Sequence, residues 1–256
     1  MGQVPVAFIS HGAPISLDDQ DWLSALHMWG KGLSSVKEIL VLSAHWVTDR
    51  LAVGPASLSP LLYDFYGFPD RFYQVSYPAP VSTFLLEKIS GLAGLGPISV
   101  EKARGLDHGM WVPLKGLFPK ADIPVLGLSI PGLSPEYLYE FGKRLSPLRN
   151  EGVLILCSGG MTHNLGDLNF QEAAPPESWA VEFDQWVVGR LLARDVRSLL
   201  KFDTQAPFSH KAHPSTEHFA PLFISLGAGE GSLSEISFPV SGFRWGTLSM
   251  RSVQFG

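Results

Sequence analysis

Cysteine is almost missing from this chain of 256 residues, which contains only one, Cys157. A single cysteine excludes any internal disulfide, and we expect a reducing location, the cytoplasm. Cys157 stands at the end of an apolar run, where it is expected to be a small buried hydrophobic residue.

Charge is also sparse, at 17% of residues, and the 24 acidic residues outnumber the 19 basic ones. The net charge of −5, without any basic cluster, argues against nucleic acid as a partner. No apolar run approaches the length that spans a bilayer, and the N-terminus lacks the positively charged start of a signal peptide. We therefore expect no membrane partner.

Apolar residues are abundant, at 45%, which is enough for a large core. No linker-like stretch divides the chain, so residues 1–256 are expected to form a single domain. The sequence leaves open whether the protein forms a homo-oligomer.

Two apolar segments run directly into a histidine. Residues 38–46 read E-I-L-V-L-S-A-H-W and end with His45 and a tryptophan, and residues 4–10 lead into His11. Short unbroken apolar runs are typical of strands buried on both faces, as in a parallel sheet covered by helices. Ligands bind at the carboxyl ends of such strands. Two strands that deliver histidines to the same edge could build a metal site.

Strands and helices are expected to alternate along the chain. Further strands are predicted at residues 98–101, 124–130, 153–158, 236–240 and 247–253, and helices at 17–29, 81–92, 111–118, 135–148 and 179–200, with another beginning at 215–218. This alternation predicts an α/β fold with a central, mostly parallel sheet flanked by helices, and a metal site at the carboxyl ends of the strands.

Five of the eight histidines stand where loops meet the expected regular elements. His11, His45 and His163 each follow a strand end, His108 lies in a loop, and His218 lies at a helix start. Any one of them alone is better explained as a structural residue, and their long spacing matches no short metal motif. Together they indicate a site for Fe(II), Zn(II), Cu(II) or Ni(II), the metals that neutral imidazole suits.

Residues 63–80 are dense in aromatic rings, interrupted by glycine and prolines. The rings either pack against the sheet or form a wall for a flat aromatic ligand. The sequence leaves both interpretations open.

Several blocks, taken together and in order, resemble the class III extradiol ring-cleavage dioxygenases of the LigB type, in particular the 4,5-DOPA dioxygenase-like subgroup. Their order along the chain follows that of the family, and they extend over nearly its whole length. The blocks are S-H-G at 10–12, S-A-H-W at 43–46, D-F-Y-G-F-P at 64–69, Y-P-A-P at 77–80, D-H-G-M-W at 107–111, S-G-G-M-T-H-N-L at 158–165, E-H-F-A-P-L at 217–222 and G-T-L-S-M at 246–250.

The resemblance implies that His11 and His45 are metal ligands, with a third ligand from the pair Glu217 and His218. Adjacent helical residues point about 100° apart, so only one of the pair can readily face the metal. We predict His218, with Glu217 as the alternative. His163 matches the family's acid/base histidine, and the resemblance gives it a second possible role as a fourth ligand in metal-loaded forms.

The resemblance also implies a second pocket histidine at His108, whose neighbour Asp107 could fix its tautomer. Tyr63, Phe65 and Phe68 are expected to line the substrate pocket.

The implied function is a non-haem extradiol ring opening of a catechol-type, DOPA-like substrate with molecular oxygen. Fe(II) is the expected working metal, and Zn(II) also suits an all-histidine site. Two alternatives remain open at this point: a zinc-dependent hydrolase on the same histidines, and a non-catalytic metal-binding relative.

Overall fold

The computed structural model of the chain describes residues 3–55, 60–92, 94–171 and 174–256. Across these residues the main sheet has eight strands, in the order β5-β4-β6-β2-β8-β1-β12-β9. The strands are β1 (Val6–Ser10), β2 (Glu38–Ser43), β4 (Ala52–Gly54), β5 (Ser99–Val100), β6 (Val125–Leu128), β8 (Val153–Gly159), β9 (Ile236–Ser237) and β12 (Val253–Phe255).

The middle of the sheet is parallel. Strand β2 pairs with β6 and β8, and β8 pairs with β1, all in parallel register. Antiparallel pairs join β4 to β6, β12 to β1 and β9 to β12. The predicted α/β fold with a mostly parallel central sheet is confirmed.

The central strands are buried on both faces, which explains their unbroken apolar sequences. Phe8, Leu40 and Leu42 point into one core, and Ile9 and Ile39 point into the other. This alternation follows from the two-residue period of a strand. Each fully buried side chain of this size contributes about 1.5–3 kcal/mol, so these strands hold the two cores together.

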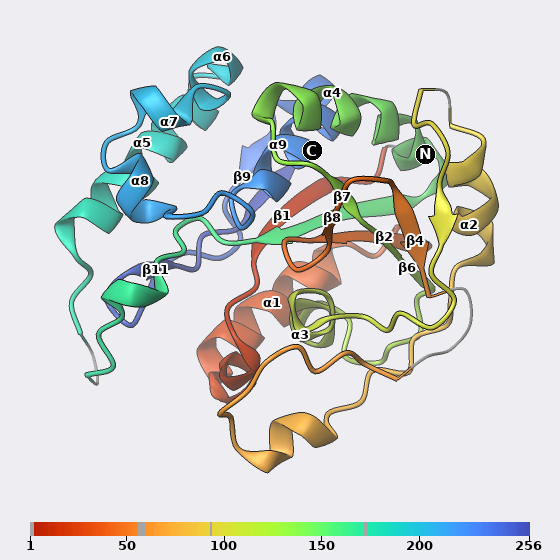
Figure 1. Cartoon of the computed structure of the whole chain (residues 1–256), viewed down its shortest axis with the longest axis horizontal. Coiled ribbons are helices and arrows are strands. Elements are labelled where there is room, and N and C mark those ends of the chain that lie inside the picture. The colour runs from red at the N-terminus through yellow and green to blue at the C-terminus, as the bar shows by residue number, and fades with distance from the viewer. Residues whose placement is uncertain (1–2, 56–59, 93, 172–173) are drawn as a thin grey trace.

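Helices cover both faces of the sheet (Figure 1). On one side lie α1 (Gln20–Gly32) and α3 (His108–Leu117), and on the other α4 (Pro135–Leu145) and α9 (Ala220–Ala228). The other helices are α2 (Thr83–Ser90), α5 (Ser178–Leu192), α6 (Val196–Leu199), α7 (Phe202–Gln205) and α8 (Ser209–Ala212).

Short elements complete the described chain. The 3-10 turns are η1 (Pro14–Asp18), η2 (Asp70–Gln74), η3 (Ser146–Glu151), η4 (Leu165–Asp167) and η5 (Glu230–Ser232). Two small ladders pair β3 (Val47–Thr48) with β7 (Ile130–Pro131), and β10 (Phe243–Arg244) with β11 (Leu248–Ser249).

Four helix predictions need correction, and three of them concern where a helix begins or ends. Helix α3 begins at His108 and not at residue 111, because the Asp107 carboxylate caps it by accepting from the Met110 amide at 3.2 Å. The single helix predicted over 179–200 is two, α5 and α6, because Arg194 has a left-handed φ of 57° between them. The segment predicted as 17–29 begins as η1, and α1 starts after its Asp19 cap.

The segment 215–218 does not begin a helix. Helix α9 starts at Ala220, so Glu217 and His218 lie in the turn before it. The Ser215 hydroxyl donates to Glu217 Oε1 at 2.9 Å. The argument from adjacent helical positions therefore does not apply to Glu217 and His218. The last predicted strands, 236–240 and 247–253, are also shorter than expected: β9, β11 and β12 hold only part of them.

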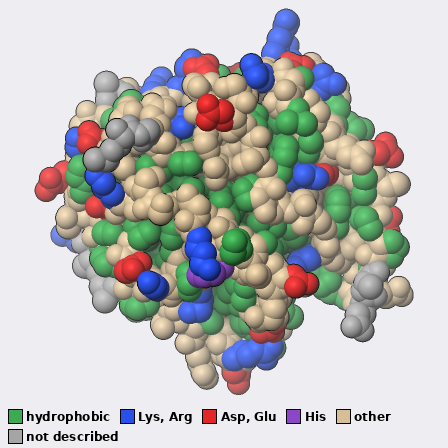
Figure 2. All heavy atoms as spheres, turned by 180° about the vertical axis from the view of Figure 1, so that it is seen from behind, with side chains coloured by type: hydrophobic (Ala, Val, Ile, Leu, Met, Phe, Trp, Pro, Cys, Tyr) green, Lys and Arg blue, Asp and Glu red, His purple; other side chains and the backbone are tan. Residues whose placement is uncertain are grey.

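On the face drawn in Figure 2, basic and acidic side chains alternate with apolar ones, and neither sign of charge covers a large area. Among the described residues, no helix combines the length and the apolar character needed to cross a bilayer.

Candidate metal centre

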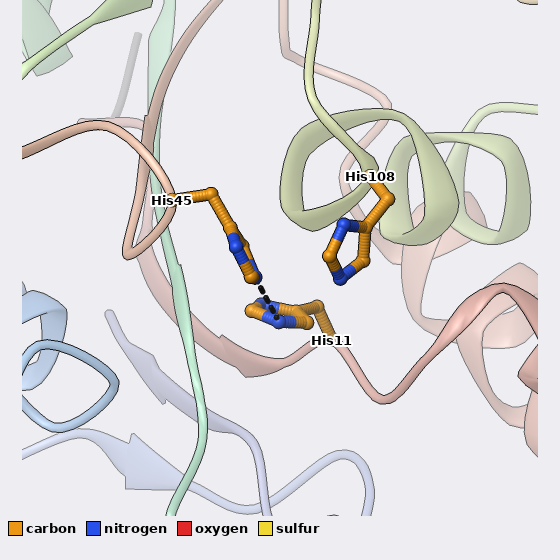
Figure 3. A group of neighbouring side chains, drawn as sticks. All are labelled: His11, His45 and His108. Atoms are coloured by element: carbon orange, nitrogen blue, oxygen red, sulfur yellow. Dashed lines mark hydrogen bonds between the residues drawn. The ribbon is translucent and has the colours of Figure 1, made fainter. Parts of the chain in front are cut away.

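The carboxyl edge of the parallel strands gathers three histidines from distant parts of the chain. His11 follows β1, His45 follows β2, and His218 precedes α9. Their ring centroids are 5.1 Å apart for His11 and His45, 5.4 Å for His11 and His218, and 4.9 Å for His45 and His218. The Nε2 atoms of His11 and His45 are 3.2 Å apart (Figure 3). The structure thus brings together the three residues predicted as ligands.

The other two predicted histidines adjoin this group. The ring of His108 lies 4.1 Å from that of His45 and 5.5 Å from that of His11, between centroids. The ring of His163 stacks on His218 at 3.4 Å. Two sets of possible ligand atoms result, with no residue in common and each within 4.8 Å: His11 with His45 and His108, and His163 with Glu217 and His218.

Two glycines permit these approaches. A Cβ at Gly159, the last residue of β8, would overlap the carbonyl of His218, and the Gly160 amide donates to that carbonyl at 2.8 Å. A Cβ at Gly109, in the first turn of α3, would lie 2.9 Å from Cδ2 of His45. Larger residues at either position would push a histidine out of the group.

The Nδ1 atom of His11 meets the Ser158 hydroxyl at 2.9 Å. The Ser158 hydroxyl donates its one proton to the Gly109 carbonyl, which can only accept. Ser158 must therefore accept from Nδ1–H of His11. This leaves the lone pair of His11 on Nε2, the atom that faces His45.

Carboxylates meet Nδ1 of three other histidines. Glu217 Oε1 lies 3.2 Å from Nδ1 of His218, and Asp64 Oδ1 lies 2.8 Å from Nδ1 of His108. Asp64 Oδ2 lies 3.5 Å from Nδ1 of His45. Burial alone would raise the pKa of Asp64, but its hydrogen bonds with the His108 ring and backbone amide lower it to about 2, so this carboxylate is ionised at neutral pH.

Burial and mutual proximity keep four of these imidazoles neutral, those of His11, His45, His163 and His218. Burial, followed by the neighbouring histidines, lowers the pKa of His45 to about 2 and that of His11 well below its usual value. Burial and His218 lower the pKa of His163 to about 3. Burial also lowers the pKa of His218, although Glu217 opposes this effect. Neutral imidazole is the form that binds a metal.

One atom of the group lacks a partner. Nε2 of His218 is buried and makes no hydrogen bond, whereas buried polar atoms are nearly always paired. A cation bound among the Nε2 atoms would satisfy it. The residues therefore fit a transition-metal ion.

The expectation that Asp107 fixes the tautomer of His108 is wrong. The Asp107 carboxylate accepts from the Ser43 hydroxyl at 2.7 Å and from Arg104 Nη2 at 2.9 Å, and it also caps α3. A residue at the N-cap turns its carboxylate toward the amides of its own helix. Asp64 contacts the His108 ring instead.

The sequence reading missed Asp64 and Ser158. Asp64 is the first residue of the D-F-Y-G-F-P block, in which only the aromatic residues were assigned a role. Ser158 is the first residue of the S-G-G-M-T-H-N-L block. The sequence signal that could have identified Asp64 and Ser158 was their position in blocks that resemble the family. A further histidine, His213, is buried outside this group, and its Nε2 contacts the Met161 carbonyl at 3.0 Å.

Tyr63 and Phe65 of the aromatic segment pack against the core, and Phe65 also reaches the histidines. Phe65 lies at the site, with its ring centroid 5.8 Å from that of His108. Tyr63 and Phe68 pack on Phe65 at 6.1 Å and 5.4 Å, and the Tyr63 hydroxyl donates to the Val75 carbonyl. Of the three predicted pocket residues, Phe65 is thus the one beside a site histidine, and the other two support it.

These features define an α/β protein with a buried histidine cluster that could bind a transition metal. The family model described as the catalytic LigB subunit of aromatic ring-opening dioxygenase matches residues 5–252. The chain belongs to this family, whose members are metal-dependent extradiol ring-cleavage dioxygenases.

Relatives named 4,5-DOPA dioxygenase extradiol support this assignment. The protein from Beta vulgaris is 41% identical, covering 90% of this chain and 88% of its own length. The protein from Escherichia coli K12 is 34% identical, covering 99% of this chain and 95% of its own length. A crystal structure of an uncharacterized Escherichia coli K12 protein superposes with a TM-score of 0.83, at 32% identity, and covers 99% of this chain and 100% of that one. These findings do not favour a hydrolase or a non-catalytic relative.

Proposed function

We propose that this protein opens the ring of a catechol-type, DOPA-like aromatic diol with molecular oxygen, at a metal held by Nε2 of His11, His45 and His218. The observation that carries this proposal is the convergence of three neutral imidazoles, of which His11 and His218 are buried and His45 is half-buried, and of which His218 has an unpartnered Nε2. The names of the relatives suggest the substrate class.

We prefer His218 to Glu217 as the third ligand. Oxygen Oε1 of Glu217 is engaged by both the Ser215 hydroxyl and Nδ1 of His218. A carboxylate in this position orients a ligating histidine and increases its basicity. Glu217 thus supports His218 rather than competing with it.

Fe(II) is the proposed working metal; when bound, it supplies the charge that acidifies a phenol and the redox centre that oxygen requires, and Zn(II) suits the same ligands. The protein's own groups manage the substrate. His163, neutral at pH 7, accepts a proton from a catechol hydroxyl, and the nearby Glu217 charge stabilises the resulting imidazolium. In a form without substrate, His163 could instead act as a fourth ligand.

His108 and the aromatic segment orient the ring. Asp64 accepts from Nδ1 of His108, so Nε2 of His108 can accept a hydrogen bond from a substrate hydroxyl. Phe65, supported by Tyr63 and Phe68, offers an apolar wall to the flat ring. The proposal includes a single catalytic domain over residues 1–256 and a reducing, cytoplasmic location, in keeping with the free, buried Cys157.

Anaerobic loading with Fe(II), followed by addition of DOPA and oxygen, tests the function. We expect one oxygen consumed per DOPA and a yellow ring-opened product that carries both oxygen atoms. Zinc-loaded protein is the control and should consume no oxygen. Absence of oxygen uptake with DOPA and with simpler catechols, in iron-loaded protein, would contradict the proposal.

A further inference from the structure

The rings of His163 and His218 are stacked in a way that prevents both from binding one ion. Their centroids are 3.4 Å apart and their planes are inclined by only 4°, so the two planes run nearly parallel. The lone pair of an imidazole nitrogen lies in the plane of its ring, and a bound metal lies in that plane too. An ion in the plane of His218 therefore lies nearly the full stacking distance outside the plane of His163. The lone pairs of His163 do not point there.

The ring of His108 meets the other histidines at a different angle. Its plane is inclined by 51° to that of His45 and by 87° to that of His11, with the centroids 4.1 Å and 5.5 Å away. Inclined planes intersect, so lone pairs in these planes can meet at one point. Each of the three residues offers a ligand atom within 4.8 Å of the others, and Figure 3 shows the rings turned toward one another.

A small movement of these side chains would close the set around an ion. Two nitrogen atoms bound to one Zn(II) at about 2.0–2.1 Å lie at most about 4.2 Å apart. The spacing within the group of His11, His45 and His108 already approaches this limit.

Asp64 leaves the required atom of His108 free. Oxygen Oδ1 of Asp64 accepts from Nδ1 of His108 at 2.8 Å and from its backbone amide at 3.0 Å. In the neutral ring the proton then lies on Nδ1 and the lone pair on Nε2. A metal-ligating histidine commonly donates its other N–H to a carboxylate in this way. Within the described part of the chain, no hydrogen bond holds the ring of His163.

We propose that His108, and not His163, is the fourth histidine that holds the metal in the substrate-free protein, and that His163 stays off the metal as a free proton acceptor. This proposal rests on the metal site of the proposed function. Its consequence is a change of role for His108. A bound catechol displaces it, and its Nε2 is then free to accept from a substrate hydroxyl.

Zn(II) is the probe for this arrangement, because it suits imidazole ligands and has no redox chemistry. Long-range ¹H–¹⁵N spectra of the full chain, recorded without and with one equivalent of Zn(II), show which ring nitrogens bind, because a nitrogen shifts when its lone pair binds a metal. We expect both nitrogens of His163 to keep their shifts. The Nε2 atoms expected to shift are those of His11, His45, His108 and His218. Catechol added to the zinc-loaded protein should return Nε2 of His108 toward its metal-free position.

His108→Gln and His163→Gln form a matched pair, since each removes one imidazole of the same cluster and glutamine keeps an N–H donor. Loss of a partner that only orients a ligand costs about 10–100-fold in metal affinity, so loss of the ligand itself should cost at least as much. We therefore expect the dissociation constant for zinc to rise at least about tenfold in His108→Gln and to stay near that of the wild type in His163→Gln. Competition with a chromogenic chelator measures both.

Zinc-induced shifts at His163 without shifts at His108 overturn the proposal, and so does a zinc affinity of His108→Gln equal to that of the wild type. Shifts at His11, His45 and His218 alone also overturn it but leave the proposed function intact. If zinc shifts none of the five histidines, the proposed function fails as well. The wild-type spectra decide between these outcomes even if a variant does not fold.

Discussion

The ring of His163 lies parallel to that of His218, with the centroids 3.4 Å apart and the planes inclined by 4°. One residue is the proposed proton acceptor and the other a proposed ligand. The His163 amide also donates to the Ala212 carbonyl, which ties its loop to the segment before His218. This stacking holds the acceptor beside the proposed metal without occupying Nδ1 of His218, which meets Glu217.

Replacing His163 with alanine should therefore separate catalysis from metal binding. We expect turnover of DOPA to fall about 10²–10⁴-fold, the usual contribution of a general base, while iron content stays near one per chain. His27→Ala, at an exposed histidine of α1, is the control and should behave as wild type. Turnover of His163→Ala near that of the control would remove His163 from the mechanism. Loss of iron from His163→Ala would favour its role as a ligand.

The choice between Glu217 and His218 can be tested by a pair of substitutions. Glu217→Gln keeps an acceptor for Nδ1 of His218, so zinc affinity should fall at most about tenfold, the lower end of the effect of an orienting partner. His218→Gln removes a ligand and should cost far more. The zinc affinities of both variants can be measured by competition with a chelator. A loss of zinc affinity in Glu217→Gln that equals or exceeds the loss in His218→Gln would identify the carboxylate as the ligand.

Ser158 should control which nitrogen of His11 carries the proton, because its hydroxyl accepts from Nδ1 of His11. In Ser158→Ala, Nδ1 of His11 and the Gly109 carbonyl both lose a buried partner. We expect a cost of about 1–3 kcal/mol in unfolding free energy and a 10–100-fold loss of zinc affinity.

Ser129→Ala is the matched control for Ser158→Ala. Ser129 is also fully buried and directly follows a strand, β6, but its hydroxyl accepts from the Ala52 amide, away from the histidines. The Ser129→Ala variant should lose as much unfolding free energy as Ser158→Ala but keep its zinc affinity. Reduced zinc affinity in both variants would mean that general destabilisation, and not the orientation of His11, explains the Ser158 effect.

Acid should destabilise the metal-free protein through His213. Burial lowers the pKa of His213 to about 3, although its hydrogen bond to the Met161 carbonyl opposes the shift. The unfolded chain binds this proton below about pH 6.5 and the folded chain does not, so stability falls as the pH falls from 6.5 toward 3. One such group contributes about 1.4 kcal/mol per pH unit.

The variant His213→Phe lacks this proton difference, and phenylalanine suits a site already packed by Phe183 and Phe219. Urea denaturation at pH 7, 6 and 5 should therefore show a flatter loss of stability in His213→Phe than in the wild type. The other buried histidines contribute equally to both proteins and cancel. Parallel curves would mean that His213 is protonated in the folded state or is exposed to solvent.

Several features of the site followed from short stretches of sequence. Unbroken apolar runs at 4–10, 38–46 and 153–158 identified buried parallel strands, because only a strand covered on both faces needs apolar residues at every position. Histidines directly after such strands had to share one edge of the sheet. The presence of His11, His45 and His163 near one another was predictable for this reason.

Other features were not predictable from neighbouring residues. Asp107 adjoins His108 in sequence, yet its carboxylate serves as the cap of α3, and the partner of the His108 ring is Asp64, 44 residues away. Likewise, Ser158 meets His11 across 147 residues. The turn that carries Glu217 and His218 was mistaken for the first turn of a helix, because serine favours both helix caps and turns.

The sequence by itself determined the α/β class, the parallel centre of the sheet and the histidines that gather at its edge, since hydrophobic period and chain order are local properties. Only the tertiary structure decided which oxygen faces each Nδ1, and thus which nitrogen is free to bind a metal. That choice depends on contacts between segments distant in sequence, where differences of an ångström separate a hydrogen bond from none.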